Sequence, residues 1–171
     1  GLEWAATIPG SLGGAVYGNA GAHGGDMAGN LLVAEILHPK QGRENWSCEQ
    51  MGYAYRSSAL KRSTEQAVIL SATLRLQPAP RDEIQARMDA NTAQRRRTQP
   101  PGASMGSMFK NPPGDYAGRL IEAAGLKGTR IGGAEISSVH ANFFVNHEGA
   151  SAQDLYRLIE QTRLTVEERF V

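Results

Sequence analysis

The sequence predicts an α+β fold, because apolar runs of strand length and segments with helical periodicity both occur along its 171 residues. Two familiar nucleotide-binding motifs are absent. No two glycines stand in G-x-G spacing, as the dinucleotide fingerprint requires, and no Gly-Lys-Ser/Thr follows a P-loop spacing. A proline-rich break at residues 77–80 (QPAP) predicts a boundary between segments 1–78 and 79–171.

Composition and charge are those of a water-soluble globular protein, with 40% hydrophobic and 20% charged residues. The net charge of +1 argues against a general nucleic-acid binder, and no apolar run is long enough to span a membrane. Cys48 is the single cysteine, which excludes an internal disulfide and makes a reducing cytoplasm the expected compartment. The chain opens at Gly1 and not at methionine, so we expect it to be truncated.

Glycines are concentrated in residues 1–29, which include the run IPGSLGGA at 8–15. Small residues at this density let the backbone approach a ligand closely and present unhindered N–H groups to a phosphate or to the edge of a ring. A glycine-rich loop with tight turns and no ligand explains the density equally well. Both interpretations stay open at this point.

Two strands are expected in the first segment. Residues 31–37 form an apolar run that ends in a turn at 38–42, and residues 67–76 alternate most clearly. This alternation places Ile69 on one face of the second strand and a set of five side chains on the other. The five are Val68, Leu70, Ala72, Leu74 and Leu76.

The second segment is expected to contain more helix. Residues 81–97 begin with two acids and end with three arginines, a charge order that complements the helix dipole. The arginine triplet at 95–97 could instead bind a diphosphate, although a solvated helix end is the favoured interpretation. Asp115 is expected to cap a short helix that Gly125 ends.

Two strands and a long helix are expected to complete the chain. Residues 132–138 and 141–146 have the pattern of strands. Ser151 and Asp154 have the spacing of a capping box at the start of the last helix. The apolar stripe of that helix is expected to face the core and consists of Leu155, Leu158, Ile159, Thr162 and Val166.

The strongest candidate for chemistry is residues 104–112 (SMGSMFKNP), which hold two hydroxyls, a cation and an amide between pairs of prolines. We expect a rigidly held loop there, with an ordinary polar turn as the alternative. Arg56 stands among aromatic and hydroxyl residues, where its planar guanidinium could bind a carboxylate, although a lone arginine is more often solvated. The four histidines lack paired ligand spacing, so no metal site is expected.

Several of these segments together resemble one enzyme family. The segments are 8–15 (IPGSLGGA) with 19–22 (NAGA), 55–58 (YRSS), 106–112 (GSMFKNP), 117–128 (AGRLIEAAGLKG) and 140–146 (HANFFVN). In this combination and order the chain resembles the UDP-N-acetylenolpyruvoylglucosamine reductase family over essentially its whole length.

The resemblance implies a fold and a set of site residues. It implies that 1–78 are the second half of a non-Rossmann FAD-binding domain and that 79–171 are an α+β substrate-binding domain. Arg56 would stabilise the negative charge that builds on the substrate, and Ser107 would donate a proton. Cofactor contacts would come from Ile8, Pro9, Gly10, Ser11, Gly13, Gly14, Asn19 and Gly21. Substrate contacts would come from Tyr55, Lys110, Asn111 and His140.

The resemblance also implies a reaction. FAD, reduced by NADPH, would serve the reduction of UDP-N-acetylglucosamine enolpyruvate to UDP-N-acetylmuramate in peptidoglycan precursor synthesis. The complete protein would be a monomer without nucleic-acid or membrane partners. The family carries a further FAD subdomain before this segment and a catalytic glutamate after it, so we expect an inactive fragment whose third catalytic residue lies beyond Val171.

Two rival functions remain. One is a non-enzymatic nucleotide-binding module, and the other is an FAD oxidase on the same kind of flavin fold. The segments that contain Arg56, Ser107 and His140 favour the reductase, since neither rival needs a proton donor beside a carboxylate clamp.

Overall fold

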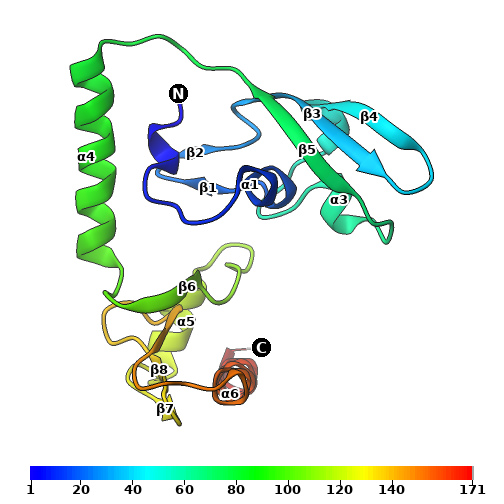
Figure 1. The fold of residues 1–171 in the computed structure, drawn as a ribbon. Coiled ribbons are helices and arrows are strands. Elements are labelled where there is room, and N and C mark those ends of the chain that lie inside the picture. The colour runs from blue at the N-terminus through cyan, green and yellow to red at the C-terminus, as the bar shows by residue number, and fades with distance from the viewer. Residues whose placement is uncertain (171) are drawn as a thin grey trace. The chain divides into compact units, whose positions relative to one another are not determined.

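The computed structural model describes residues Gly1–Phe170. The chain divides into two compact units, Gly1–Ala93 and Gln94–Val171, and each contains helices and strands (Figure 1). The predicted α+β class is therefore confirmed. The division falls within α4 (Arg81–Thr98), the helix predicted at 81–97. The functional roles predicted for segments 1–78 and 79–171 stay predictions.

The first unit is built around a three-stranded antiparallel sheet in the order β4-β3-β5, with α1 packed against β5. A glycine-containing hairpin of β1 and β2 precedes the sheet. The elements are η1 (Glu3–Ala5), α1 (Leu12–Gly18), β1 (Gly21–Ala22), β2 (Gly25–Asp26), β3 (Leu31–His38), β4 (Gly42–Ser47), α2 (Cys48–Met51), α3 (Ala59–Arg62) and β5 (Val68–Leu74). Their core contains Trp4, Val16, Met27, Leu31, Ala34, Ile36, Met51 and Leu60.

Strand β5 does not keep the single alternation that its sequence suggests. Ser71 and Ile69 pair with consecutive residues of β3, so Leu70 between them is the extra residue of a β-bulge. Before the bulge Ile69 packs on the core and Val68 is exposed, whereas after it Ala72 packs on the core. Predicting one continuous face for these side chains was therefore wrong, because one inserted residue exchanges the two faces of a strand.

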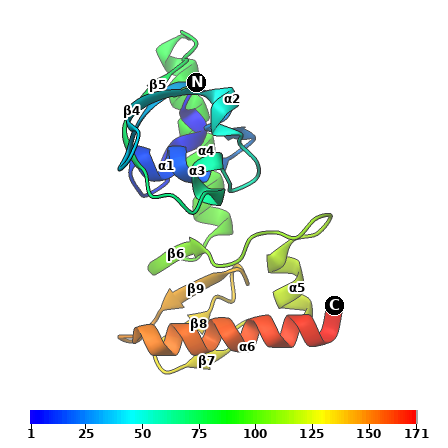
Figure 2. The ribbon, with the colours of Figure 1, turned by 90° about the vertical axis from the view of Figure 1, so that its right-hand side faces the viewer.

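The second unit is a four-stranded antiparallel sheet in the order β6-β9-β8-β7, with α6 packed against β7, β8 and α5 (Figure 2). Its elements after α4 are β6 (Ala103–Ser107), α5 (Ala117–Ala123), β7 (Arg130–Ile131), β8 (Ala134–Ile136), β9 (Phe143–Asn146) and α6 (Ala152–Phe170). Its core contains Ile121, Ala124, Leu126, Ala134, Ile136, Ala141, Phe144 and Leu158.

Helix α6 has the predicted cap and the predicted buried stripe. The Ser151 hydroxyl accepts the N–H of Asp154 at 3.1 Å, and the Asp154 carboxylate accepts the N–H of Ser151 at 3.0 Å. Leu158 and Thr162 are buried, and the other three residues of the stripe pack against the same core. The capping box and the helical period thus predicted this element correctly.

Three other predictions in this unit need correction. The stretch expected to be a loop begins as strand β6, and the strand expected at 132–138 is limited to β8, since Gly132 and Gly133 form the turn that joins β8 to β7. The residue before α5 is Tyr116, while Asp115 lies one residue earlier and accepts the N–H of Tyr116 at 2.7 Å. Gly125 does end this helix, with φ +76°.

Among residues Gly1–Phe170, no helix is both long and apolar enough to cross a membrane. The same residues bring no three histidine, cysteine, aspartate or glutamate side chains together as metal ligands.

Candidate functional site

Five of the predicted cofactor residues line one pocket of the first unit. Its volume is about 410 Å³, and its other walls are largely apolar, with Trp4, Met27 and Leu74 among them. Gly10 enters this pocket with φ +134°, a conformation that residues with a side chain rarely adopt. The predicted residues that line the pocket are Ile8, Pro9, Gly10, Ser11 and Gly14.

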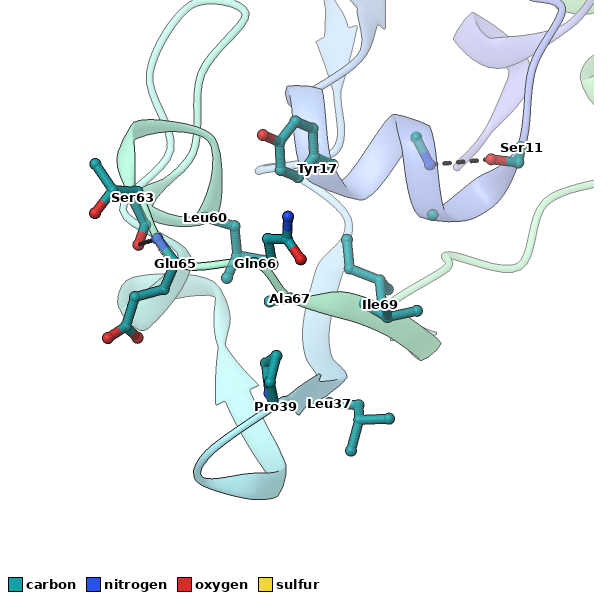
Figure 3. Close-up of a pocket in the computed structure, with 14 residues that line it drawn as sticks. Ser11, Tyr17, Leu37, Pro39, Leu60, Ser63, Glu65, Gln66, Ala67 and Ile69 are labelled. Carbon is teal, nitrogen blue, oxygen red and sulfur yellow. Dashed lines mark hydrogen bonds between the residues drawn. The ribbon is translucent and has the colours of Figure 1, made fainter.

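A second pocket of about 810 Å³ lies between α1 and β5, and Gly13 faces it together with Ser11 and Gly14. Figure 3 shows Tyr17 of α1 at one side of this pocket and Leu37 and Pro39 at the other. The Ser11 hydroxyl accepts the N–H of Gly14 at 3.1 Å and so caps α1. The glycine-rich segment therefore borders two hollows, and its backbone is accessible from both.

Asn19 and Gly21, the other two predicted cofactor residues, line neither pocket. The amide of Asn19 is buried and fully engaged within the protein. It donates to Asp26 Oδ2 at 3.3 Å and to the carbonyl of Ala54 at 3.2 Å, and it accepts the N–H of Ala28 at 3.0 Å. In this structure Asn19 connects the end of α1 to the segment that contains Arg56.

Arg56 occupies a tight turn between Ala54 and Ser57, whose backbone groups form two hydrogen bonds of 3.1 and 3.0 Å. Its φ is +53°, which is uncommon for a residue other than glycine and is typical of functional sites. The guanidinium donates from Nη2 to the carbonyl of Gly21 at 2.7 Å and stands 5.2 Å from the centre of the Tyr55 ring. Arg56 is thus half-buried and held at several points.

Both ends of this turn are attached to the last residues of α1. The Tyr53 hydroxyl donates to the carbonyl of Val16 at 2.8 Å, and the Ser58 hydroxyl donates to the carbonyl of Tyr17 at 2.7 Å. Ser58 is fully buried, and burial raises the pKa of Tyr53, so the Tyr53 hydroxyl stays a protonated donor. These bonds fix the position of Arg56 relative to the glycine-rich segment.

The second unit brings together three predicted site residues from two segments that lie far apart in sequence. Ser107, Asn111 and His140 line one pocket of about 460 Å³. Lys110 is exposed and does not line it. The remaining lining residues are Tyr116, Gly118, Arg119, Glu122, Val139, Ala141 and Asn142.

Ser107 reaches this pocket through a bulge in β6. Ser104 pairs with Val145 and Ser107 pairs with Phe143, so two residues of β6 stand opposite one residue of β9. Gly106, the second of the two, has φ +82°. Bulges redirect the side chain that follows them, and here that side chain is the predicted proton donor.

Replacing Gly106 by alanine is expected to lower the free energy of unfolding by about 1–2 kcal/mol, because a Cβ at this φ is strained although it would have open space. The amide resonances of Ser107 are expected to move in the same variant. Gly149→Ala is the matched control, since Gly149 has φ +68° and equally open space. Urea unfolding and NMR spectra measure both effects. If the Ser107 resonances stay in place in Gly106→Ala, the bulge does not set the geometry of Ser107.

His140 is held as a neutral ring. Its Nδ1 accepts the N–H of Asn142 at 3.2 Å, so the proton of the neutral imidazole lies on Nε2. The ring packs 4.8 Å from that of Phe143, and a Cβ on Gly118 would stand 3.1 Å from its Cε1. This burial lowers the pKa of His140 below its ordinary value.

The lowered pKa of His140 predicts a pH dependence of stability. Below the ordinary histidine pKa of about 6.5 the unfolded chain binds a proton that the folded chain still excludes. Stability is therefore expected to fall as the pH drops through that value, and His140→Gln is expected to flatten this fall. Urea unfolding of both proteins between about pH 7.5 and about pH 5.5 measures it. Equal slopes would contradict the assignment.

Asn111 and Asp115 support the wall of the pocket that α5 forms. The Asn111 carbonyl Oδ1 accepts the N–H of Ala117 at 3.1 Å, at the first turn of α5. Asp115 accepts Nε–H of Arg119 at 2.6 Å, and the Arg119 guanidinium lowers the pKa of Asp115 to about 2. Arg119 thus stays paired with a carboxylate over the whole neutral range of pH.

The pocket includes residues that were not predicted as site residues. Arg119 and Glu122 stand three apart on α5 and share one face of it, a spacing that could have indicated them. Asn142 stands two residues from His140 but carries no pattern that separates it from an ordinary polar residue. Gly118 contacts the His140 ring only because the fold brings α5 to that position.

Comparison with known proteins relates the chain to one family. Residues 97–171 match the family described as "UDP-N-acetylenolpyruvoylglucosamine reductase, C-terminal domain". The proteins named UDP-N-acetylenolpyruvoylglucosamine reductase from Chloroflexus aggregans and Bacillus subtilis are 53% and 47% identical to 99% of this chain, which covers 58% and 56% of their lengths. A Bacillus licheniformis protein of the same name is 47% identical, and 92% of it is covered.

A solved structure agrees with these relatives. The crystal structure of UDP-N-acetylenolpyruvylglucosamine reductase from Thermus caldophilus superimposes with a TM-score of 0.87 at 40% identity, over 96% of this chain and 60% of that one. Together with the Bacillus licheniformis protein, most of whose length this chain covers, these matches establish the relationship. The chain belongs to the UDP-N-acetylenolpyruvoylglucosamine reductase family.

Proposed function

We propose that this chain forms the second part of the FAD site and most of the substrate site of a reductase that converts UDP-N-acetylglucosamine enolpyruvate to UDP-N-acetylmuramate. The reaction would use NADPH and serve peptidoglycan precursor synthesis in the cytoplasm. Residues 1–78 would contribute to the FAD-binding domain and residues 79–171 to the substrate-binding domain.

The single observation that carries the proposal is the pocket of the second unit. Ser107 and Asn111 come from one segment and His140 from another, yet all three line one hollow of about 460 Å³. A hydroxyl, an amide and a neutral imidazole can donate hydrogen bonds to a polar ligand, and Ser107 can in addition release a proton. A generic nucleotide-binding module does not need this combination.

The residues of the first unit fit FAD. The pocket beside Gly10 combines an accessible glycine backbone, suited to phosphates, with apolar walls that include Trp4 and Met27, suited to a ring system. A Cβ at Gly10 would meet nothing within 4 Å, so the space beside this backbone is open. Ile8, Pro9, Ser11, Gly13 and Gly14 would hold the group with it. When bound, FAD would supply the reducing equivalents received from NADPH.

The protein's own groups would stabilise charge and move one proton. Reduction would place a hydride on the terminal carbon of the enolpyruvyl double bond, which becomes a methyl group, and negative charge would build on the carbon that bears the carboxylate. The Arg56 guanidinium would stabilise this charge through the carboxylate. Ser107 Oγ would give its proton to this carboxylate-bearing carbon and would regain one from solvent. Tyr55, Lys110, Asn111 and His140 would contact the substrate.

The experiment that tests the proposed function uses a chimera in which these 171 residues replace the matching part of the Chloroflexus aggregans relative. The chimera is expected to bind FAD and to oxidise one NADPH for each sugar nucleotide reduced, with little NADPH consumption when the sugar is omitted. NADPH consumption that yields hydrogen peroxide without sugar would indicate the oxidase instead. Nucleotide binding without any flavin chemistry would indicate the binding module.

The 171-residue chain alone is expected to hold FAD weakly or not at all. It spans 58% of the Chloroflexus aggregans relative, and the ligand surface supplied by the rest of that protein would be missing. Absorbance of the purified chain after reconstitution and dialysis measures the retained flavin. An equimolar yellow chromophore that survives dialysis would contradict the prediction.

A further inference from the structure

Asn142 connects the two segments that carry Ser107 and His140. The residue is 3% exposed and lies at the turn between His140 and strand β9. Nothing in the proposed chemistry uses this buried amide. A buried amide without partners would cost stability, so its hydrogen bonds show what it holds in place.

The first contact continues the antiparallel pairing past the last residue of β6 and the first residue of β9. After the Ser107–Phe143 pair, the N–H of Met108 donates to the carbonyl of Asn142 at 2.8 Å. This bond fixes the backbone immediately after Ser107. The bulge interrupts the backbone hydrogen bonds between β6 and β9 before Ser107, and the Met108–Asn142 bond continues them after Ser107.

The side chain of Asn142 then takes the place of a further peptide group. Its Oδ1 accepts the N–H of Phe109 at 2.8 Å, and its Nδ2 donates to the carbonyl of Phe109 at 2.8 Å. Both backbone groups of Phe109 are therefore paired with one amide. An ionised carboxylate cannot reproduce this pattern because it has no donor, and a hydroxyl has its donor and acceptor on a single oxygen instead of on two separate atoms.

The backbone of the same residue orients His140. The N–H of Asn142 donates to His140 Nδ1 at 3.2 Å, which leaves Nε2–H free to donate. One residue therefore has hydrogen bonds both to the segment after Ser107 and to the imidazole ring, and Ser107, His140 and Asn142 line the same pocket.

We propose that Asn142 is a positioning residue for Ser107: its amide holds Met108 and Phe109 so that the Ser107 hydroxyl keeps the geometry needed for proton donation. This inference rests on the proposed function, in which Ser107 is the proton donor. Small displacements of a reacting group cost large factors in rate, so loosening this segment slows the step that uses Ser107.

Asn142→Asp is the informative substitution, since it keeps the shape and the acceptor for Phe109 N–H but places an oxygen opposite the carbonyl of Phe109. Asn146→Asp is the matched control on the same strand, where Oδ1 accepts the N–H of Ala150 at 2.8 Å. Asn142→Ser, which removes the amide and leaves room for water, replaces the aspartate variant if that variant does not fold.

The test is a double-mutant cycle in the chimera, read as the rate at which the enolpyruvyl sugar oxidises the reduced flavin. With Ser107 present, Asn142→Asp is expected to slow this step by about 10-fold or more, and Asn146→Asp to leave it near wild type. In the Ser107→Ala background the Asn142 substitution is expected to change the rate by less than about three-fold, because there is no serine proton left to position.

Each other outcome overturns the inference in its own way. Equal slowing in both backgrounds means that Asn142 acts through stability or substrate binding and not through Ser107. No slowing with Ser107 present means that the amide does not position it. If Ser107→Ala alone stays within a few-fold of wild type, the proton-donor role itself fails and the inference fails with it. The Ser107→Ala rate is measured without any Asn142 variant. Failure of the proton-donor role is therefore distinguishable from failure of the positioning role alone.

Discussion

Replacing Ser107 by alanine in the chimera is expected to slow oxidation of the reduced flavin by the enolpyruvyl sugar by roughly 10²–10⁴-fold, the usual loss for a positioned acid. FAD binding and flavin reduction by NADPH are expected to stay near wild type. The reason is local: Ser107 follows the β6 bulge and lines the pocket of the second unit, and the residues that fit FAD belong to the first unit. Stopped-flow absorbance separates the two half-reactions.

Two further variants sharpen this prediction. Ser107→Cys is expected to recover part of the lost rate, since a thiol can still donate a proton. Ser104→Ala is the matched control, because Ser104 lies on the same strand, is exposed, and does not line the pocket of Ser107. A Ser107→Ala rate within a few-fold of wild type would show that the hydroxyl is not the acid.

Replacing Arg56 by lysine is expected to slow the same half-reaction by roughly 10²–10³-fold, the loss typical of one donor that stabilises developing charge. Lysine keeps the charge but not the planar group whose Nη1 and Nη2 reach the carbonyls of Asn19 and Gly21 at 3.4 and 2.7 Å. Flavin reduction by NADPH is expected to change much less. Single-turnover kinetics with excess sugar nucleotide measure the effect.

Arg62→Lys provides the control for Arg56. Arg62 also donates from both terminal nitrogens near this turn, to the Ser57 hydroxyl at 3.1 Å and to the carbonyl of Gly52 at 2.8 Å. Its replacement removes a comparable set of bonds without touching the predicted catalytic group. Equal losses in both half-reactions for Arg56→Lys would mean that Arg56 serves structure only.

Capping residues and helical periodicity predicted the helices α5 and α6, because these patterns determine where a helix begins or ends and which face is buried. The Ser151 and Asp154 pair defined the start of α6, and its helical period identified Leu158 and Thr162 as buried. Gly125 marked the end of α5 because a left-handed residue is the common way to end a helix. In each case the deciding contacts lie within one helical turn, so the sequence contains them.

Features that depend on pairing between distant residues were missed. The bulge at Leu70 is created by the register with β3, and no local pattern of β5 records it. The sequence predicted a loop where strand β6 lies. The strand could not be recognised locally, because its pairing partners in β9 lie about forty residues away. The prolines beside it predicted a held loop, and they carry no signal for a strand.

In the candidate site, too, the sequence identified some residues and missed others. Ser107, Asn111 and His140 were identified from motifs, and the structure places them around one pocket. Asn142 was overlooked as a site residue because its role comes from contacts with Phe109, 33 positions earlier in the chain. Motifs point to residues that touch ligands, whereas residues that hold them in position become visible only in the fold.

NMR can locate the sugar nucleotide on the folded protein. Titration of the isotope-labelled chimera with UDP-N-acetylmuramate, the proposed product, is expected to shift the resonances of Ser107, Gly118 and His140, which line or contact one pocket. Gly149 has no part in that pocket and is expected to stay in place. Saturable binding that leaves Ser107, Gly118 and His140 unshifted would contradict the central claim that this pocket holds the substrate.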